Sequence, residues 1–168
     1  MQPEDLLPTA IEPRLGAVWI PAMDVEAFIR EVFELADCEV GYSAQAGAWS
    51  VRYEEWKARQ NVKVMQEFGT SRMNAMELVQ CALNVQVPTV RDPDPESDRT
   101  LVNPDETLAA REKLGLIKDR FAAWAFDDAE RREKLCRIYN DLFNATRPRQ
   151  FDGAHLKLPG SSRCSWSA

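Results

Sequence analysis

Apolar residues recur at helical spacing in two stretches of the first half of the chain. Steps of three and four residues place such positions on one face of a helix, so each stretch predicts an amphipathic helix. Asp24, a residue type favoured at helix N-caps, precedes the first stretch: Val25, Phe28, Ile29, Val32, Leu35 and Ala36. The break at Gly69-Thr70-Ser71 offers a cap for the second stretch: Ala75, Leu78, Val79 and Ala82.

The last third of the chain carries the clearest helix signal. In Asn103-Pro104-Asp105-Glu106, an N-cap residue is followed by a proline at the first helical position and by a capping-box glutamate. The apolar stripe that follows comprises Thr107, Ala110, Leu114, Ile117, Phe121 and Trp124. Asp127 or Asp128 then starts another helix, whose inward positions are Leu135, Ile138, Tyr139 and Leu142. Because the joint is tight, we expect residues 105–144 to form an antiparallel αα-hairpin.

Alternation with a period of two predicts β-strands between these helices. The runs from Cys38 to Ser43 and from Trp49 to Tyr53 are joined through Gly47, which is the pattern of a β-hairpin. The run 62–64 is a candidate third strand. Further short strands are expected near residues 89 and 101, beside a Pro/Asp-rich solvent loop over 92–99. The predicted fold class is α+β: about four helices, with the C-terminal αα-hairpin packed on a small antiparallel sheet.

The same pattern divides the chain into three regions. Residues 1–22 contain four of the ten prolines and show no periodicity, so we predict an extended arm. Residues 23–145 are predicted to form the α+β core domain. Residues 146–168 lose the periodicity and are predicted to be a basic, irregular tail.

Length and composition are those of an ordinary globular domain. The chain has 168 residues, 45% hydrophobic and 29% charged, and no apolar run approaches the ~20 residues that span a bilayer. The first five residues are acidic where a signal peptide would be basic, so we expect a cytoplasmic protein. The cysteines are too sparse for a disulfide scaffold or a zinc site, and we expect reduced thiols at Cys38, Cys81, Cys136 and Cys164.

Charge is distributed unevenly around a net value of −6. Residues 1–40 carry nine acidic and two basic side chains, whereas residues 130–163 carry eight basic and four acidic ones. An acidic head and a basic tail indicate different neighbours at the two ends, although solvated helix faces produce the same asymmetry.

Common catalytic motifs are absent from the sequence. It has no G-x-x-x-x-G-K-[ST] phosphate loop, no G-x-G-x-x-G turn and no H-E-x-x-H zinc motif. The single histidine, His155, falls in the predicted tail, where no rigid element positions it for nucleophilic catalysis. We therefore predict a protein that is not an enzyme and that uses no cofactor or metal.

Two features near the N-terminus are candidates for binding a partner protein. Trp19, in Trp19-Ile20-Pro21, either anchors the arm on the core or faces a partner. The carboxylates of the first predicted helix either form its solvated face or mimic phosphates toward a nucleic-acid-binding protein: Asp24, Glu26, Glu31 and Glu34.

Basic residues are candidates for binding nucleic acid. Arg72 lies beside Gly69-Thr70, where a guanidinium and a helix N-terminus can attract a phosphate, although capping alone also explains these residue types. The tail mixes positive charges with flat rings, which suits single-stranded nucleic acid but also describes an ordinary solvated tail: Arg147, Arg149, Phe151, His155 and Lys157.

An ordered set of short motifs runs along the chain. In the N-terminal half these are RLGAVWIP (14–21), FGTSRMNA (68–75) and ALN (82–84), and in the C-terminal half YNDLFN (139–144), FDGAHL (151–156) and LPG (158–160). The set resembles a segment of the very large methylase-helicase proteins of phages, plasmids and integrative elements, over roughly residues 6–160. The resemblance implies a position between an adenine-type DNA methylase domain and a superfamily-two helicase motor, in proteins linked to DNA modification and antirestriction.

Two functions of different classes remain open. The first is a non-catalytic accessory or coupling module, resembling the segment between methylase and helicase, that makes weak contacts with DNA or with a neighbouring helicase or methylase domain. The alternative is a mobile-element-encoded inhibitor of the anti-CRISPR or antirestriction type, whose acidic N-terminal region binds a host defence nuclease complex. Neither hypothesis involves a membrane.

Overall fold

The computed structural model describes residues 4–144, which combine helices with two antiparallel sheets of two strands each. The α+β class predicted from the sequence is thereby confirmed. The helices and strands are, in chain order, α1 (Ala22–Val32), β1 (Cys38–Ser43), β2 (Ala48–Tyr53), α2 (Glu55–Gln60), α3 (Ala75–Leu83), β3 (Arg91–Pro93), β4 (Thr100–Val102), α4 (Pro104–Asp127) and α5 (Ala129–Tyr139). Single turns add η1 (Pro8–Ala10, 3₁₀), η2 (Lys63–Glu67, π) and η3 (Asn140–Asn144, π).

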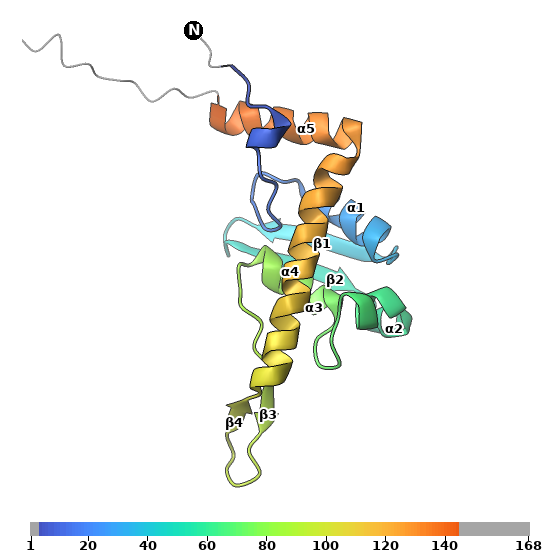
Figure 1. Cartoon of the computed structure of the whole chain (residues 1–168), viewed down its shortest axis with the longest axis vertical. Helices are drawn as coiled ribbons and strands as arrows, with labels where there is room; N and C mark the ends of the chain where they lie inside the picture. The colour runs from blue at the N-terminus through green and yellow to red at the C-terminus, as the bar shows by residue number, and fades with distance from the viewer. Residues whose placement is uncertain (1–3, 145–168) are drawn as a thin grey trace, which may run out of the picture.

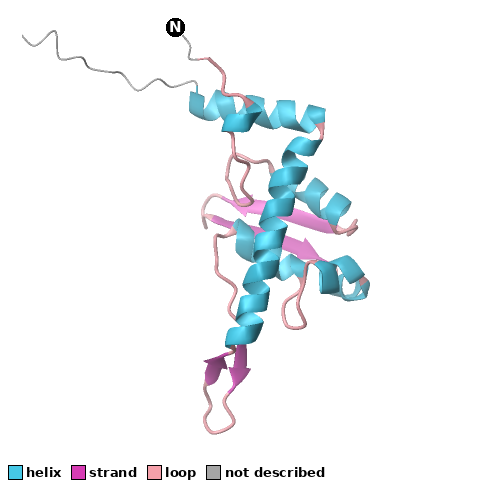
Figure 2. Ribbon diagram, viewed as in Figure 1, coloured by secondary structure: helices cyan, strands magenta, loops and turns pink. Residues whose placement is uncertain are grey.

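The long helix α4 sets the arrangement of the other elements (Figure 1). It runs along the long axis of the picture, with α5 across one end and the β3–β4 hairpin at the other. The β1–β2 hairpin, α1 and α3 lie beside its middle part, as the colouring by secondary structure makes plain (Figure 2). The core therefore lies against one side of α4.

The ends of α4 and its buried stripe explain why it forms. The side chain of Asn103 accepts a hydrogen bond from the backbone N–H of Glu106 at 3.1 Å, and Pro104 occupies the first turn. The apolar stripe predicted from the sequence is buried: Thr107, Ala110, Leu114, Ile117, Phe121 and Trp124. On α1, the ring of Phe28 meets the rings of Phe121 and Trp124 edge-on, at centroid distances of 5.1 and 5.5 Å.

The β1–β2 hairpin has the register that its alternation predicts. Val40 pairs with Val51, and Gly47 turns the chain at a φ of +60°. Val40, Trp49 and Val51 are buried, and α1 packs against β1 while α3 packs against β2. Residues 11–20 add Ile11, Leu15 and Ile20 to the buried core.

The segment after the β1–β2 hairpin differs from its prediction. The run 62–64 is not a strand: Val62 is exposed, and Val64 is the one buried residue of the turn η2. The reason is Asn61, whose side-chain Nδ2 donates to the Phe33 carbonyl at 2.7 Å while its Oδ1 accepts from the Val64 N–H at 3.2 Å. These bonds close a turn where a strand would need an extended backbone. Helix α2, which precedes this turn, was not predicted.

The two predicted helix caps in the first half of the chain lie elsewhere. Pro21 occupies the N-cap position of α1, so Asp24 falls within its first turn. Asn74, and not the 69–71 segment, caps α3, with Glu77 completing a capping box at 3.0 and 2.8 Å. Helix α3 keeps its predicted inward face. Helix α1 ends at Val32, so the predicted positions Leu35 and Ala36 lie beyond it, and Ala36 is exposed.

The C-terminal helical pair is present, and its joint is a single residue. Asp128 has extended dihedral angles (φ −87°, ψ 133°), and its side chain accepts from the Arg131 N–H at 2.8 Å, which caps α5. This sharp joint directs α5 across the end of α4 (Figure 1). In the antiparallel hairpin predicted from the sequence, α5 would instead run back along α4.

A polar clamp built on Trp124 joins α1, α4 and α5. The Trp124 indole N–H donates to Glu31 Oε2 at 2.6 Å, and the Arg131 guanidinium lies 3.6 Å from the centre of the Trp124 ring. The Arg131 guanidinium also donates to the Trp124 carbonyl at 3.1 and 2.8 Å. Since the Arg131 side chain is only 14% exposed, these contacts are shielded from water.

We expect Arg131→Met to lower the free energy of unfolding by about 1–2 kcal/mol, because it removes a cation–π contact and charge-assisted hydrogen bonds while keeping the apolar stem. Arg132→Met is the matched control, since Arg132 lies on the same helix and is exposed. Urea unfolding followed by circular dichroism measures both variants. Equal stability of the two variants would contradict the role of the clamp.

Candidate interaction groove

The α1 carboxylates proposed for partner binding make hydrogen bonds within the chain. Asp24 is buried, and both of its oxygens accept from Lys134 Nζ, at 2.8 and 2.9 Å. Glu26 Oε1 accepts from the backbone N–H of Val40 at 2.8 Å. These three bonds tie α1 to α5 and to β1.

The other two carboxylates are also engaged, although their side chains remain more than half exposed. Glu31 belongs to the clamp around Trp124. Glu34 Oε1 accepts from Lys63 Nζ at 2.6 Å. The four carboxylates therefore point to four different elements and do not form a continuous row of free charges.

The basic candidates fall into two groups. Arg72 pairs with Asp92 at 2.6 Å and donates to the Arg91 carbonyl at 3.2 Å, so its guanidinium is committed to the base of the β3–β4 hairpin. Hydrogen bonds from the side chains of Asn103 and Arg72 lower the pKa of Asp92 below its ordinary value, and the Asn103 bond has the larger effect. The remaining nucleic-acid-binding candidates lie outside the described residues: Arg147, Arg149, His155 and Lys157.

Trp19 anchors the arm on α5 and at the same time borders a surface depression. Its half-buried ring meets Tyr139 edge-on at a centroid distance of 5.2 Å. The depression has a volume of about 450 Å³ and is also lined by Phe143 and by Glu12, Arg14 and Ala17 of the arm. Phe143 is 56% exposed. The structure thus combines the anchoring and surface-facing roles considered for Trp19.

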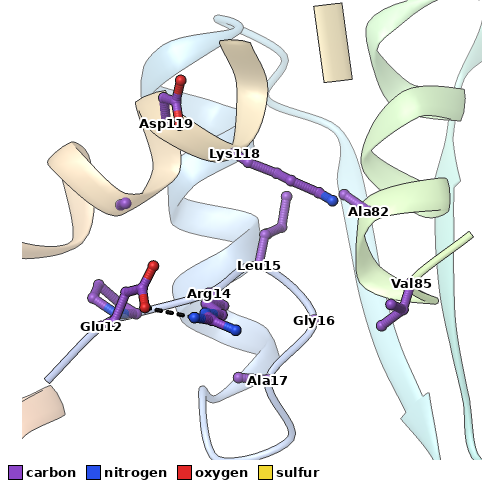
Figure 3. A pocket seen from close by; sticks show the side chains of 11 residues that line it. Glu12, Arg14, Leu15, Gly16, Ala17, Ala82, Val85, Lys118 and Asp119 are labelled. Atoms are coloured by element: carbon purple, nitrogen blue, oxygen red, sulfur yellow. Dashed lines mark hydrogen bonds and ion pairs between the residues drawn. The ribbon is translucent and has the colours of Figure 1, made fainter. Parts of the chain in front are cut away.

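A larger depression lies on the other side of the same arm residues (Figure 3). Its volume is about 550 Å³, and the two depressions share Glu12, Arg14 and Ala17. We call the two together the arm groove. Its far wall comes from the end of α3 and from α4, with Ala82, Val85, Lys118, Asp119 and Ala122.

The backbone beside the arm groove is unusual at two positions. Gly16 has a φ of +95°, and a Cβ there would lie 2.5 Å from the Leu83 carbonyl oxygen, so only glycine lets the arm approach the end of α3. Val85 has a φ of +55°, which is strained for a β-branched residue, and it is 82% exposed. The fold therefore presents an apolar side chain to the groove in an unfavourable conformation.

Four charged side chains line the arm groove: Glu12, Arg14, Lys118 and Asp119. Glu12 and Arg14 form an exposed ion pair at 2.7 Å. Lys118 extends from α4 toward Ala82 at the end of α3 (Figure 3), and neither Lys118 nor Asp119 forms an ion pair within residues 4–144. Sequence reasoning missed Val85, Lys118 and Asp119. The available signal was that the predicted second helix ends without a glycine, so another residue must adopt the left-handed conformation that terminates it.

The described region offers little for nucleophilic or metal chemistry. Burial raises the pKa of the thiols of Cys38, Cys81 and Cys136, which disfavours the reactive thiolate form. Between residues 4 and 144 there is no group of three or more His, Cys, Asp or Glu side chains placed to hold a metal ion. None of the helices in that range is long and apolar enough to cross a membrane.

The fold and the groove define a small α+β domain with a surface depression lined by both apolar and charged side chains. A family model for a domain of unknown function, DUF8437, matches residues 14–145, and the chain belongs to this family. The matched region contains Gly16, Val85 and the α4 wall of the arm groove. No curated protein and no solved structure matches the chain.

We expect Val85→Gly to raise the free energy of unfolding by up to about 1 kcal/mol, because glycine adopts a positive φ without the strain of a β-branched side chain. Val87→Gly is the control: Val87 is 65% exposed and its φ is not positive, so glycine there only adds unfolded-state entropy. Urea unfolding measures both variants. The strain assignment fails if Val85→Gly is no more stable than Val87→Gly.

Asp92 makes a pH-dependent contribution to stability. Since its pKa is lowered in the folded state, the contribution is present above the unfolded pKa of about 3.9 and is lost as the pH falls through the folded value. We expect Asp92→Asn to lower the melting temperature at pH 7 more than at pH 3. Asp98→Asn, which alters an exposed carboxylate with no ion pair among the described residues, should show no such difference.

Proposed function

We propose that the chain is a non-catalytic accessory module that binds a segment of a partner protein in the arm groove. Val85 carries this proposal: the fold tolerates a strained backbone in order to keep an apolar side chain 82% exposed beside the groove. Strain of this kind is retained at functional sites, whereas glycine would relieve it. The exposed rings of the adjoining depression add surface of the type that is enriched in protein interfaces.

Charge favours a protein over a nucleic acid as the partner of this region. Residues 145–168 carry four basic side chains and one acidic one, and residues 1–3 carry none, so residues 4–144 have a net charge of −9. Such a body repels the phosphate backbone. A coupling module can contact DNA or a neighbouring protein domain, and the charge of residues 4–144 favours the protein domain.

The proposed module has no catalytic activity of its own, because the sequence lacks the phosphate loop needed for nucleotide hydrolysis and the Asn-Pro-Pro-Tyr-type motif of adenine methylases. We expect the purified chain to show neither ATP hydrolysis nor methyl transfer above background. Activity that a point substitution in this chain abolishes would overturn this part of the proposal.

Site-specific photo-crosslinking tests the groove as a docking site. A benzophenone amino acid is placed at Val85 or at Phe143, at the two ends of the arm groove, in cells that carry the gene. We expect both positions to yield the same crosslinked protein, which mass spectrometry identifies. The control position is Val62, which is 64% exposed and does not line the groove. Crosslinks to DNA, the same product from Val62, or none from the groove positions would refute the proposal.

The inhibitor hypothesis is a second candidate, and the net charge of −9 supports it. This support comes from the total charge of residues 4–144. It does not come from the carboxylates of Asp24, Glu26, Glu31 and Glu34, which form hydrogen bonds within the chain. If this hypothesis holds, the purified chain competes with DNA for a defence nuclease complex, and the competition weakens with added salt because the contact is electrostatic.

A further inference from the structure

The β3–β4 hairpin extends beyond the N-terminal end of α4 (Figure 1). No residue of either strand is buried, and Leu101 and Val102 are 57% and 48% exposed. A hairpin with two strands and no core beneath it is marginally stable by itself. Its stability must therefore come from other contacts.

Polar bonds at the base of the hairpin provide those contacts. Asp92 pairs with Arg72 at 2.6 Å and accepts from Asn103 Nδ2 at 2.7 Å. The Val90 N–H donates to Thr107 Oγ1 at 3.0 Å, which attaches the base to the first turn of α4. The strands are thus held firmly at one end while both faces stay open to solvent.

The hydrogen-bonding pattern shows which backbone groups remain free. The Asn103 N–H donates to the Val90 carbonyl and the Asp94 N–H to the Arg99 carbonyl, both at 2.9 Å. In an antiparallel ladder, bonded and non-bonded pairs alternate, so the N–H and C=O groups of Thr100 and Val102 point away from β3. The outer edge of β4 therefore offers two donors and two acceptors.

The outer edge of β3 is different, because Pro93 occupies one of its outward positions and has no N–H. The β4 edge has no proline and no charged residue to discourage pairing, and it presents Leu101 and Val102 beside the free backbone groups. An exposed apolar edge of this kind is a template for another strand. Only one side of the hairpin is suited to strand addition.

Charge defines the kind of strand that fits this edge. The hairpin and its loop, residues 91–102, carry four acidic and two basic side chains, on a body with a net charge of −9. We propose that the outer edge of β4 binds an extended, basic segment of a partner protein by β-strand addition. Backbone bonds supply the affinity and the acidic loop selects for Lys or Arg. This surface is separate from the arm groove and does not depend on it.

A defined peptide tests the proposal with the full chain. The probe is a fluorescent acetyl-Lys-Val-Lys-Val-Lys-Val-amide, and binding is followed by fluorescence anisotropy. Val102→Pro removes an outward N–H, and we expect it to weaken binding at least about tenfold. Val102→Thr is the matched control: it keeps both the β-branch and the N–H, so its affinity should stay within about twofold of the wild type.

Two further probes keep the result interpretable if Val102→Pro fails to fold. The same peptide N-methylated at all six residues has no backbone N–H to donate from either edge, so it should bind the wild-type chain at least about tenfold more weakly. A Glu-Val peptide of equal length should also bind more weakly. Equal binding of either peptide, or unchanged binding by folded Val102→Pro, overturns the proposal. Sedimentation equilibrium provides another check, because self-association removed by Val102→Pro would make a second copy the occupant and would also overturn it.

Discussion

Burial of one face of α4 is the constraint on which the rest of the structure depends. Removing Leu114, Ile117, Phe121 and Trp124 from water stabilises the fold by roughly 1.5–3 kcal/mol for each large side chain. The elements that cover this face, α1 and α3, bring the β1–β2 hairpin with them. The arm then closes over the end of α3, at Gly16. Both surfaces proposed for binding are therefore positioned by a single helix, with the arm groove beside it and the β3–β4 hairpin at its N-terminal end.

Much of the fold could be predicted because its strongest signals are local. The cap at Asn103, the proline after it and the steps of three and four define α4 within a residue of its observed start. Alternation likewise defines β1 and β2. The turn at 61–67 could not be predicted in this way, because Asn61 forms it by bonding to the carbonyl of Phe33, which is distant in sequence. Helix α2 was missed for a related reason: it is short, and its only buried residue is Ala58.

The candidate site was much less predictable than the fold. A carboxylate on a helix looks the same in sequence whether it faces water or a buried lysine, so the partner of Asp24, more than a hundred residues away, could not be anticipated. Trp19 stood out in the sequence because an aromatic residue in a proline-rich arm needs a packing partner, and the structure provides it at Tyr139. Val85 had one signal in the sequence, the lack of a glycine where α3 ends. Lys118 and Asp119 have none, because the groove wall exists only where the arm crosses α3 and α4.

Pro93 has a consequence for how large an assembly can grow. A hairpin with two equivalent edges could stack on copies of itself, with β4 of one copy against β3 of the next, until a fibre formed. Here the missing N–H on the β3 side interrupts that series at its first member. Pairing at β4 is therefore self-limiting. The chain can expose an apolar strand edge to its surroundings and still form a complex of fixed stoichiometry.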